Sequence, residues 1–267
     1  WYGFTHGTDP NFEGPQTWRG NLKLDMLTAS GYDISIEYNR DKVKKDVDFR
    51  DYSYEVESVL ADGRPVTDSN ENTYITNTSQ GGGYSITTAV QKGFDNGLEL
   101  YFGYTNMHQE DVAAMTSAQH SSSYGYQPRG YGEIVPAARS SFMNEHKFVL
   151  ALSTTQIIGD NDTTFSLLGI RKSGEPHSIT FDGDSFNGRG RDGYDLAYIP
   201  TGADDPNVVF SSGQVAQDVM NFVNSKGCIS KYAGQIIPRN TCDNPWQGRI
   251  DLRITQEIAL GDKGHKL

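Results

Sequence analysis

Strict alternation of apolar and polar residues is the feature that most constrains how this sequence can fold. From Tyr32 to Asn39 every second residue is apolar, and the residues between them are polar. This period of two is typical of a β-strand with one apolar and one wet face. The pattern recurs in six further segments, at residues 22–26, 84–90, 98–105, 148–152, 165–167 and 250–258. The sequence therefore predicts seven strands, with an eighth that begins near His265.

The connections between these strands alternate between short and long. The short turns are rich in residues that tolerate positive φ, and they lie at Ser30-Gly31, Asp95–Gly97, Gly159–Asp162 and Gly261–Lys263. The long connections run roughly over Val43–Gly82, Met107–Glu145 and Ser173–Trp246, far beyond the usual ~4–6 residues. This order is typical of an outer-membrane barrel, in which one rim carries short turns and the other carries long loops. We therefore expect an all-β, antiparallel, up-and-down transmembrane β-barrel segment with long extracellular loops.

Alternation alone leaves two other interpretations open. In a secreted β-sandwich that binds carbohydrate or mediates adhesion, the apolar residues would form a core between two sheets. In a small outer-membrane porin, eight strands would close by themselves. Exposure of the apolar side chains distinguishes the sandwich from the barrels. Aromatic residues near strand ends suit an interfacial girdle, although ordinary strand ends carry them too: Trp18, Tyr32, Tyr84, Tyr101, Tyr104 and Trp246.

Composition excludes other classes of protein. The mean hydropathy is −0.59, and the sequence has no apolar run near the ~20 residues of a membrane-spanning helix. A membrane role would therefore use strands or surface attachment. The formal net charge is −11, with Lys and Arg interspersed among a larger number of carboxylates. Because phosphate binding needs a basic face, we do not expect a nucleic-acid partner.

Two local features lie within the longest connection. Cys228 and Cys242 are close in sequence, which suits a loop disulfide in an oxidising compartment, while two free thiols remain the alternative. The segment Gln214–Val223 departs from the β pattern, because Val215, Val219, Phe222 and Val223 fall on one helical stripe. We interpret it as a short helix that packs within the loop.

The motifs of catalytic and metal sites are missing. The six histidines are scattered, without zinc-site spacing, and the acidic stretch Asp182–Asp195 has Phe186 at a ligand position of a calcium loop. Nucleophile elbows, P-loops and dinucleotide fingerprints are also missing. We therefore expect no enzymatic activity, no catalytic residues, no metal and no cofactor.

Two sets of residues are candidates for function. The aromatic, Ser-rich loop 121–131 suits ligand capture, since Tyr offers both a stacking surface and a hydroxyl; a flexible loop without a ligand is the alternative. Its candidate binding residues are Tyr124, Tyr126, Arg129 and Tyr131. The last predicted strand carries a charged ladder of alternating sign, Arg249, Asp251, Arg253 and Glu257. In a barrel these charges would face the lumen, and in a soluble sheet they would face water.

Several segments resemble elements of the Oar-like TonB-dependent receptors. Residues 245–258 are similar to that family's "PWxxRxDLRxxQEI" strand, which is the most specific of the similarities. Other elements agree in order and spacing: the "GYSYxLTxxLQKxFxNGL" hairpin at 83–98, a strand with an "SGxPxS" turn at 163–178, "LxYxPT" at 195–201 and "xRN" at 238–240. The resemblance covers roughly residues 15–267.

This resemblance implies that residues 1–267 are a fragment from the C-terminal half of a receptor barrel of about 22 strands, in the outer membrane of a Gram-negative bacterium. The parent protein would bind a nutrient ligand with its loops and plug, and admit it when TonB pulls on the plug. The implied partners are outer-membrane lipid, the receptor's own plug domain and the TonB complex. The plug and the TonB box are not in this sequence. The substrate stays open between siderophore, peptide and oligosaccharide.

Overall fold

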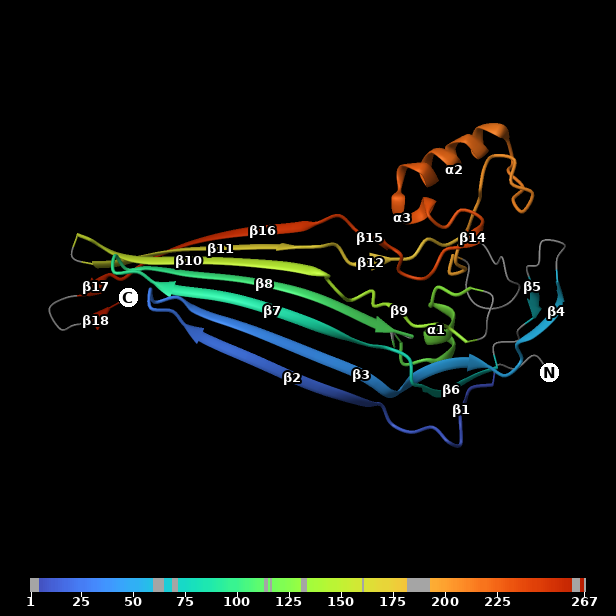
Figure 1. Cartoon of the computed structure of the whole chain (residues 1–267), viewed down its shortest axis with the longest axis horizontal. Helices are drawn as coiled ribbons and strands as arrows, with labels where there is room; N and C mark the ends of the chain where they lie inside the picture. Colours follow the sequence, from blue (N-terminus) through green and yellow to red (C-terminus); the bar gives the residue numbers. More distant parts are fainter. Residues whose placement is uncertain are drawn as a thin grey trace.

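Seven antiparallel strands lie side by side in the order in which they follow one another along the chain (Figure 1). They are β2 (Gln16–Leu27), β3 (Asp33–Asp51), β7 (Gly82–Gly93), β8 (Leu98–Asp111), β10 (His146–Ile158), β11 (Asn161–Lys172) and β16 (Gln247–Gln256). The computed structural model describes residues 5–59, 65–68, 72–112, 115, 117–130, 134–159, 161–181, 193–260 and 265–266. Each of the seven strands overlaps one segment predicted by alternation, so the predicted meander is confirmed. We call these strands the meander.

All the described short turns lie at one end of the meander, and the long connections lie at the other (Figure 1). Gly31, Gly97 and Gly159 adopt positive φ in the turns, as the turn chemistry predicts. At the turn end, β17 (Ala259–Leu260) pairs with β18 (His265–Lys266), so a strand segment does begin at His265. The predicted turn at Gly261–Lys263 lies outside the described residues.

The prediction of a loop from Val43 to Gly82 is wrong. Strand β3 continues to Asp51 and pairs there with β6 (Thr73–Thr78), which also pairs in parallel with β1 (Gly7–Thr8). The alternation is hard to recognise here because Val47 and Phe49 lie among charged residues, although both apolar side chains are buried. A further hairpin joins β4 (Glu55–Val59) and β5 (Pro65–Asp68). Among the described residues, the sheet to which these strands belong has ten strands, is mixed and is not closed.

The other two long connections contain helices and short strands. The second connection holds α1 (His120–Gly125) and β9 (Ala138–Arg139). The third holds β12 (Pro176–His177), β13 (Tyr198–Ile199), α2 (Gly213–Ser225), α3 (Gly227–Ser230), β14 (Gln235–Ile236) and β15 (Cys242–Asp243). Within the part of the chain that the structure describes, no helix has the length and apolar character to cross a membrane.

The buried hydrophobic clusters lie at the loop end of the molecule. One cluster packs Val47 and Phe49 of β3 against Tyr124 of α1. The other is a small core of the third connection, formed by Ala197, Ile199, Val223, Ile229, Ile237 and Cys242. We call the segment that surrounds this second core, residues 193–243, the loop subdomain. It carries the disulfide between Cys228 and Cys242, which is the pairing that the sequence analysis expects.

Helix α2 covers the predicted segment, but its inner face is partly different from the predicted stripe. Val219 and Val223 pack on the loop core, and Ala216 is buried beside them. Val215 and Phe222 are 41% and 49% exposed. The predicted stripe was therefore too wide, because the small core that α2 covers contacts only a narrow part of the helix.

Candidate functional site

The meander has one continuous apolar face. Cross-strand registers place Leu24 opposite Ile36, Phe102 opposite Leu150, and Leu167 opposite Leu252, so the apolar side chains of neighbouring strands share a side of the sheet. We call the following residues the apolar face: Leu22, Leu24, Met26, Ile34, Ile36, Tyr38, Ile86, Val90, Leu98, Leu100, Phe102, Leu150, Leu152, Phe165, Leu167, Ile250, Leu252 and Ile254.

This apolar face is uncovered. Leu24 is 62% exposed, and Leu252, on the edge strand β16, is 76% exposed. Neither hydrophobic cluster includes a residue of the apolar face. Among the described elements, the long strands of the meander contact their neighbours in the sheet, and no helix or second sheet packs across the face. Within the described residues, the apolar face therefore has no packing partner.

Aromatic rings line the loop end of the apolar face. Tyr104 stacks on Phe148 with ring centroids 4.7 Å apart, and Trp246 lies 5.9 Å from the ring of His146. Tyr84 and Trp18 occupy the corresponding ends of β7 and β2. At the turn end, the Lys92 ammonium lies 4.2 Å from the Tyr32 ring centroid and 4.8 Å from that of Phe94. The apolar face is thus bordered by rings at both ends.

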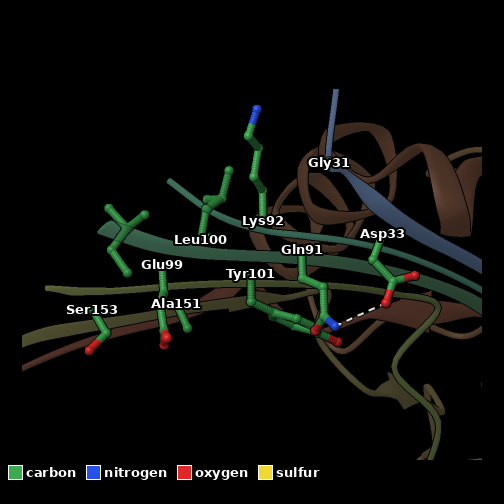
Figure 2. A pocket seen from close by; sticks show the side chains of 11 residues that line it. Gly31, Asp33, Gln91, Lys92, Glu99, Leu100, Tyr101, Ala151 and Ser153 are labelled. Atoms are coloured by element: carbon green, nitrogen blue, oxygen red, sulfur yellow. Dashed lines mark hydrogen bonds between the residues drawn. The ribbon is translucent and has the colours of Figure 1, made fainter. Parts of the chain in front are cut away.

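The opposite face of the meander is mostly polar, with an apolar exception at Val149, Leu168 and Ile170. Figure 2 shows the alternation near the turn end, where Lys92 and Leu100 project from one side of the strands and Gln91, Tyr101 and Asp33 from the other. The Gln91 amide donates a hydrogen bond to Asp33 over 3.2 Å, beside a hollow of about 400 Å³. Tyr101 therefore belongs to the polar face and does not extend the ring borders of the apolar face.

The charged ladder lies along β16 on the polar face, opposite alternate residues of β11. Arg249 Nε donates to Asp251 over 2.7 Å. Arg253 Nε instead donates to the Thr255 hydroxyl over 3.1 Å, and no described carboxylate forms an ion pair with it. Glu257 follows the end of β16 and donates its backbone N–H to the Asp162 carbonyl. Arg253 is thus the arginine of this ladder whose charge is left without a carboxylate on the described strands.

The structure places the four candidate loop residues in different environments. Tyr124 is fully buried, and Arg129 is 4% exposed with its guanidinium 4.0 Å from the Tyr124 ring centroid. Arg129 also donates to the Phe49 carbonyl over 3.3 Å, so it connects α1 to β3. Tyr126 is exposed and lies edge-on to Tyr194, with centroids 5.4 Å apart. Tyr131 lies outside the described residues. A ligand arriving from solvent would meet Tyr126 before the two buried side chains.

Tyr126 borders a polar cleft of about 380 Å³ between the second and third long connections. The cleft is lined by Gln127, His177, Ser178, Tyr194, Arg239 and Asn240, among others. Gln127 is 5% exposed, and neither its amide oxygen nor its amide nitrogen has a hydrogen-bond partner among the described residues. The Nδ1 atom of His177 is also buried and unpaired. Buried polar atoms are normally paired, so these atoms mark the cleft as a candidate binding site.

A second, apolar hollow of about 430 Å³ adjoins this cleft and shares Pro128 and Arg239 with it. Its lining includes Ile134, Val135, Leu196, Ile236 and Ile237. The two cavities together join unpaired amide atoms to an aliphatic surface. Both volumes fall in the range of small-ligand sites.

Hydrogen bonds between distant segments hold the cleft together. Asn240 has φ of 56°, and its backbone N–H donates to the Ser178 hydroxyl over 2.9 Å. The Asn240 side-chain amide donates to the Arg139 carbonyl over 2.6 Å. Arg239 forms an ion pair with Asp111 at 2.8 Å, at the end of β8. These bonds hold Arg239 and Asn240, which line the cleft, against the meander and the second connection.

Sequence reasoning missed Gln127 and His177 as site residues. The cleft is assembled from segments far apart in the sequence, and a lone Gln carries no local signal. Two of the short elements that carry the family resemblance, at 173–178 and 238–240, both line this cleft. The presence of both elements was the one feature of the sequence that could have pointed to a site formed by these segments.

Neither protein-family models, nor curated proteins, nor solved structures give a match to this chain. The described residues also contain no group of three or more His, Cys, Asp or Glu side chains that could hold a metal ion. The acidic stretch 182–192 lies outside the described residues.

Proposed function

We propose that this chain forms part of the barrel wall and extracellular loops of an outer-membrane transport receptor, of the TonB-dependent, Oar-like kind that the sequence resembles. The observation that carries the proposal is the uncovered apolar face of seven antiparallel strands, with a polar face behind it. The lipid hydrocarbon would cover the apolar face, and the polar face would line a hydrated lumen.

The size of the apolar face supports lipid as its covering. Contiguous apolar patches on soluble monomers rarely exceed a few hundred Å², and larger ones mark an interaction surface. Burying each Val, Leu, Ile, Phe or Met side chain contributes about 1.5–3 kcal/mol. All but Tyr38 of the residues of the apolar face are of these types; facing water they would make the sheet strongly prone to aggregation, whereas facing hydrocarbon they stabilise it.

The dimensions also suit a bilayer. From Tyr84 to Lys92, strand β7 rises about 26 Å at ~3.3 Å per residue. Outer-membrane barrels have an apolar band of about 25 Å between aromatic girdles. A strand tilted by about 40° turns the rise of β7 into about 20 Å along the membrane normal, and the rings at the two ends extend it toward that height. The rings and the lysine at the two ends of the apolar face would then lie at the two interfaces.

The open sheet supports a place in a larger wall. In the described structure, β2 and β16 each pair along one side only. Unpaired strand edges are not tolerated in hydrocarbon, because their N–H and C=O groups would have no partners. Further strands of the same receptor would close the barrel. Coupling to a plug and to TonB follows from the family resemblance alone. A sandwich is less well supported, because no second described sheet faces the apolar side chains.

Two neighbouring leucines provide a matched test of the lipid-facing side. Leu167 belongs to the apolar face, and Leu168 is opposite Asp251 on the polar face. Leu167→Cys and Leu168→Cys would each be labelled with a bimane fluorophore in the full-length receptor in lipid vesicles. We expect nitroxide-bearing lipid chains to quench the label at 167 and aqueous iodide to quench the label at 168. Equal quenching by lipid at both positions, or at neither, would contradict the proposal.

A further inference from the structure

We propose that the polar cleft and the adjoining apolar hollow together bind a short neutral peptide, with a peptide amide on Gln127 and an aliphatic side chain in the hollow. This inference names the ligand class of the proposed receptor, and as a statement about transport it rests on that function. Binding itself is a property of the loops.

The side chain of Gln127 determines the polar half of the ligand. A carboxamide offers hydrogen-bond donors on nitrogen and an acceptor on oxygen, which is the complement of a peptide unit. Gln127 lines the cleft, and neither end of its amide has a hydrogen-bond partner among the described residues. Leaving buried polar groups unpaired destabilises a fold, so a partner supplied by a ligand would be bound favourably. The nearby unpaired Nδ1 of His177 adds a second polar contact.

The apolar hollow determines the apolar half of the proposed ligand. Its aliphatic lining, with Val135, Leu196 and Ile237 buried, has the size for an isobutyl or similar group. Pro128 and Arg239 line both the hollow and the cleft. In our proposal one ligand spans these two residues, with an amide in the cleft and a neighbouring side chain in the hollow. Amide and side chain are joined in this way in every amino-acid residue.

Charge favours a neutral peptide over a sugar or an anion. Among the described residues that line the two cavities, none is Asp or Glu. Carboxylates are strong acceptors for the many hydroxyl donors of a sugar, and the cavities offer none. The one Arg that lines them, Arg239, forms an ion pair with Asp111 through one terminal nitrogen, while its Nε has no hydrogen-bond partner among the described residues. Its positive charge is thus balanced by Asp111, and the free Nε–H can donate to a neutral carbonyl oxygen of a peptide.

The test uses blocked amino acids as probes, titrated by calorimetry into the full-length receptor in detergent. The probes are N-acetyl-leucine methylamide, N-acetyl-glycine methylamide and methyl α-glucoside. We expect the leucine probe to bind at least tenfold more tightly than the glycine probe, because the isobutyl group enters the hollow. We expect the glucoside to bind more weakly than either. Preference for the glucoside would overturn the peptide assignment.

Two variants locate the binding. Gln127→Leu should weaken both peptide probes about tenfold or more without lowering the melting temperature, because it removes an unpaired buried amide. Gln214→Leu, on the exposed surface of α2, is the matched control and should bind as the parent does. Ile134→Ala removes an exposed side chain of the hollow and should weaken the leucine probe alone.

If Gln127→Leu disturbs folding, the selectivity of Ile134→Ala decides the question. Unchanged binding of the leucine probe in Ile134→Ala would then reject the site. Lipid quenching at position 167 without any peptide binding would reject this inference and leave the proposed wall in place. Peptide binding without lipid quenching at position 167 would support the binding site and reject the proposed barrel wall.

Discussion

Asp205 shows how one buried carboxylate organises the loop subdomain. Its Oδ2 atom accepts hydrogen bonds from the Thr201 backbone N–H at 2.7 Å, the Thr201 hydroxyl at 2.9 Å and the Tyr198 hydroxyl at 3.2 Å. Its Oδ1 accepts from the Asn207 N–H at 2.9 Å. The Thr201 N–H contributes most to holding the pKa of Asp205 below its ordinary value, and the other donors add to it against the opposing effect of burial. The ionised form is therefore the one that the fold stabilises.

The lowered pKa predicts a pH dependence. A carboxyl whose pKa is depressed on folding contributes stability above its unfolded pKa, and this contribution is lost as the pH falls from about 4 through the folded pKa. Asp205→Asn should remove this acid-dependent loss and cost about 1–3 kcal/mol at pH 7, because hydrogen bonds to a charge are exchanged for weaker ones. Amide exchange at Thr201 and Asn207, measured against pH, provides the readout.

The neighbouring exposed residue supplies the control for this prediction. Asp204→Asn removes the same charge one position away and should leave both the exchange rates and their pH dependence close to those of the parent. Equal effects of the two substitutions would show that net charge, and not the hydrogen bonds of Asp205, controls the stability of the segment.

At single residues, the sequence was least informative where burial decides the role. Tyr124 and Arg129 have the chemistry of a binding loop. Tyr124, in α1, packs against Phe49, and Arg129, after α1, donates to the Phe49 carbonyl; nothing local in the sequence signals either contact. Gln127 has no distinguishing local pattern, yet its position in the cleft leaves its amide unpaired. Long-range packing determines both outcomes, and a single sequence does not carry it.

At the scale of elements, the strands were predictable because alternation and turn chemistry are local. The starts of β7, β8 and β10 lie within two residues of the predicted segments, whereas β8 and β10 each continue six residues beyond them. The turn glycines lie where positive φ is required. The continuation of β3 to Asp51 was missed because β6, its partner there, is separated from it by a hairpin and has a polar, Thr-rich sequence. The fold of the third connection was predicted only for α2 and the disulfide.

The disulfide leads to a prediction for helices α2 and α3. Cys228 and Cys242 close a segment with a sequence separation of 14, and such a cross-link is worth about 3 kcal/mol through the unfolded state. Reduction should therefore loosen α2 and α3, which pack on the core that contains Cys242. The meander shares no residue with that core and should be unaffected. Hydrogen exchange of α2 and of β11, with and without reductant, measures this difference.

The double variant Cys228→Ala/Cys242→Ala separates loss of the cross-link from side effects of the reductant. It should reproduce the faster exchange of α2 under non-reducing conditions. An equal acceleration of exchange in β11 would show that the loop subdomain and the meander unfold together, contrary to the independent core described above.

At the scale of the whole molecule, the two faces of the meander divide the proposed tasks. The apolar face would contact lipid, the loop end would hold the cleft, and the polar face would line the lumen. An Arg facing hydrocarbon at the midplane costs about 2–4 kcal/mol, which favours a lumen position for Arg249 and Arg253. Arg249 pairs with Asp251, while Arg253 forms no ion pair with a described carboxylate. In the proposed receptor, Arg253 would therefore be the arginine of the ladder that can pair with a plug.

We therefore predict that Arg253→Leu in the full-length receptor weakens plug seating and raises the passive leak of small antibiotics. Binding of the leucine probe at the loops should stay nearly unchanged, since the cleft is formed by the long connections and not by β16. Arg253→Lys keeps the charge and should restore most of the seal. Arg249→Leu, which removes an arginine already paired within the strand, should leak less than Arg253→Leu. Conductance in planar bilayers measures the leak, and loss of probe binding without added conductance would assign Arg253 to ligand recognition instead.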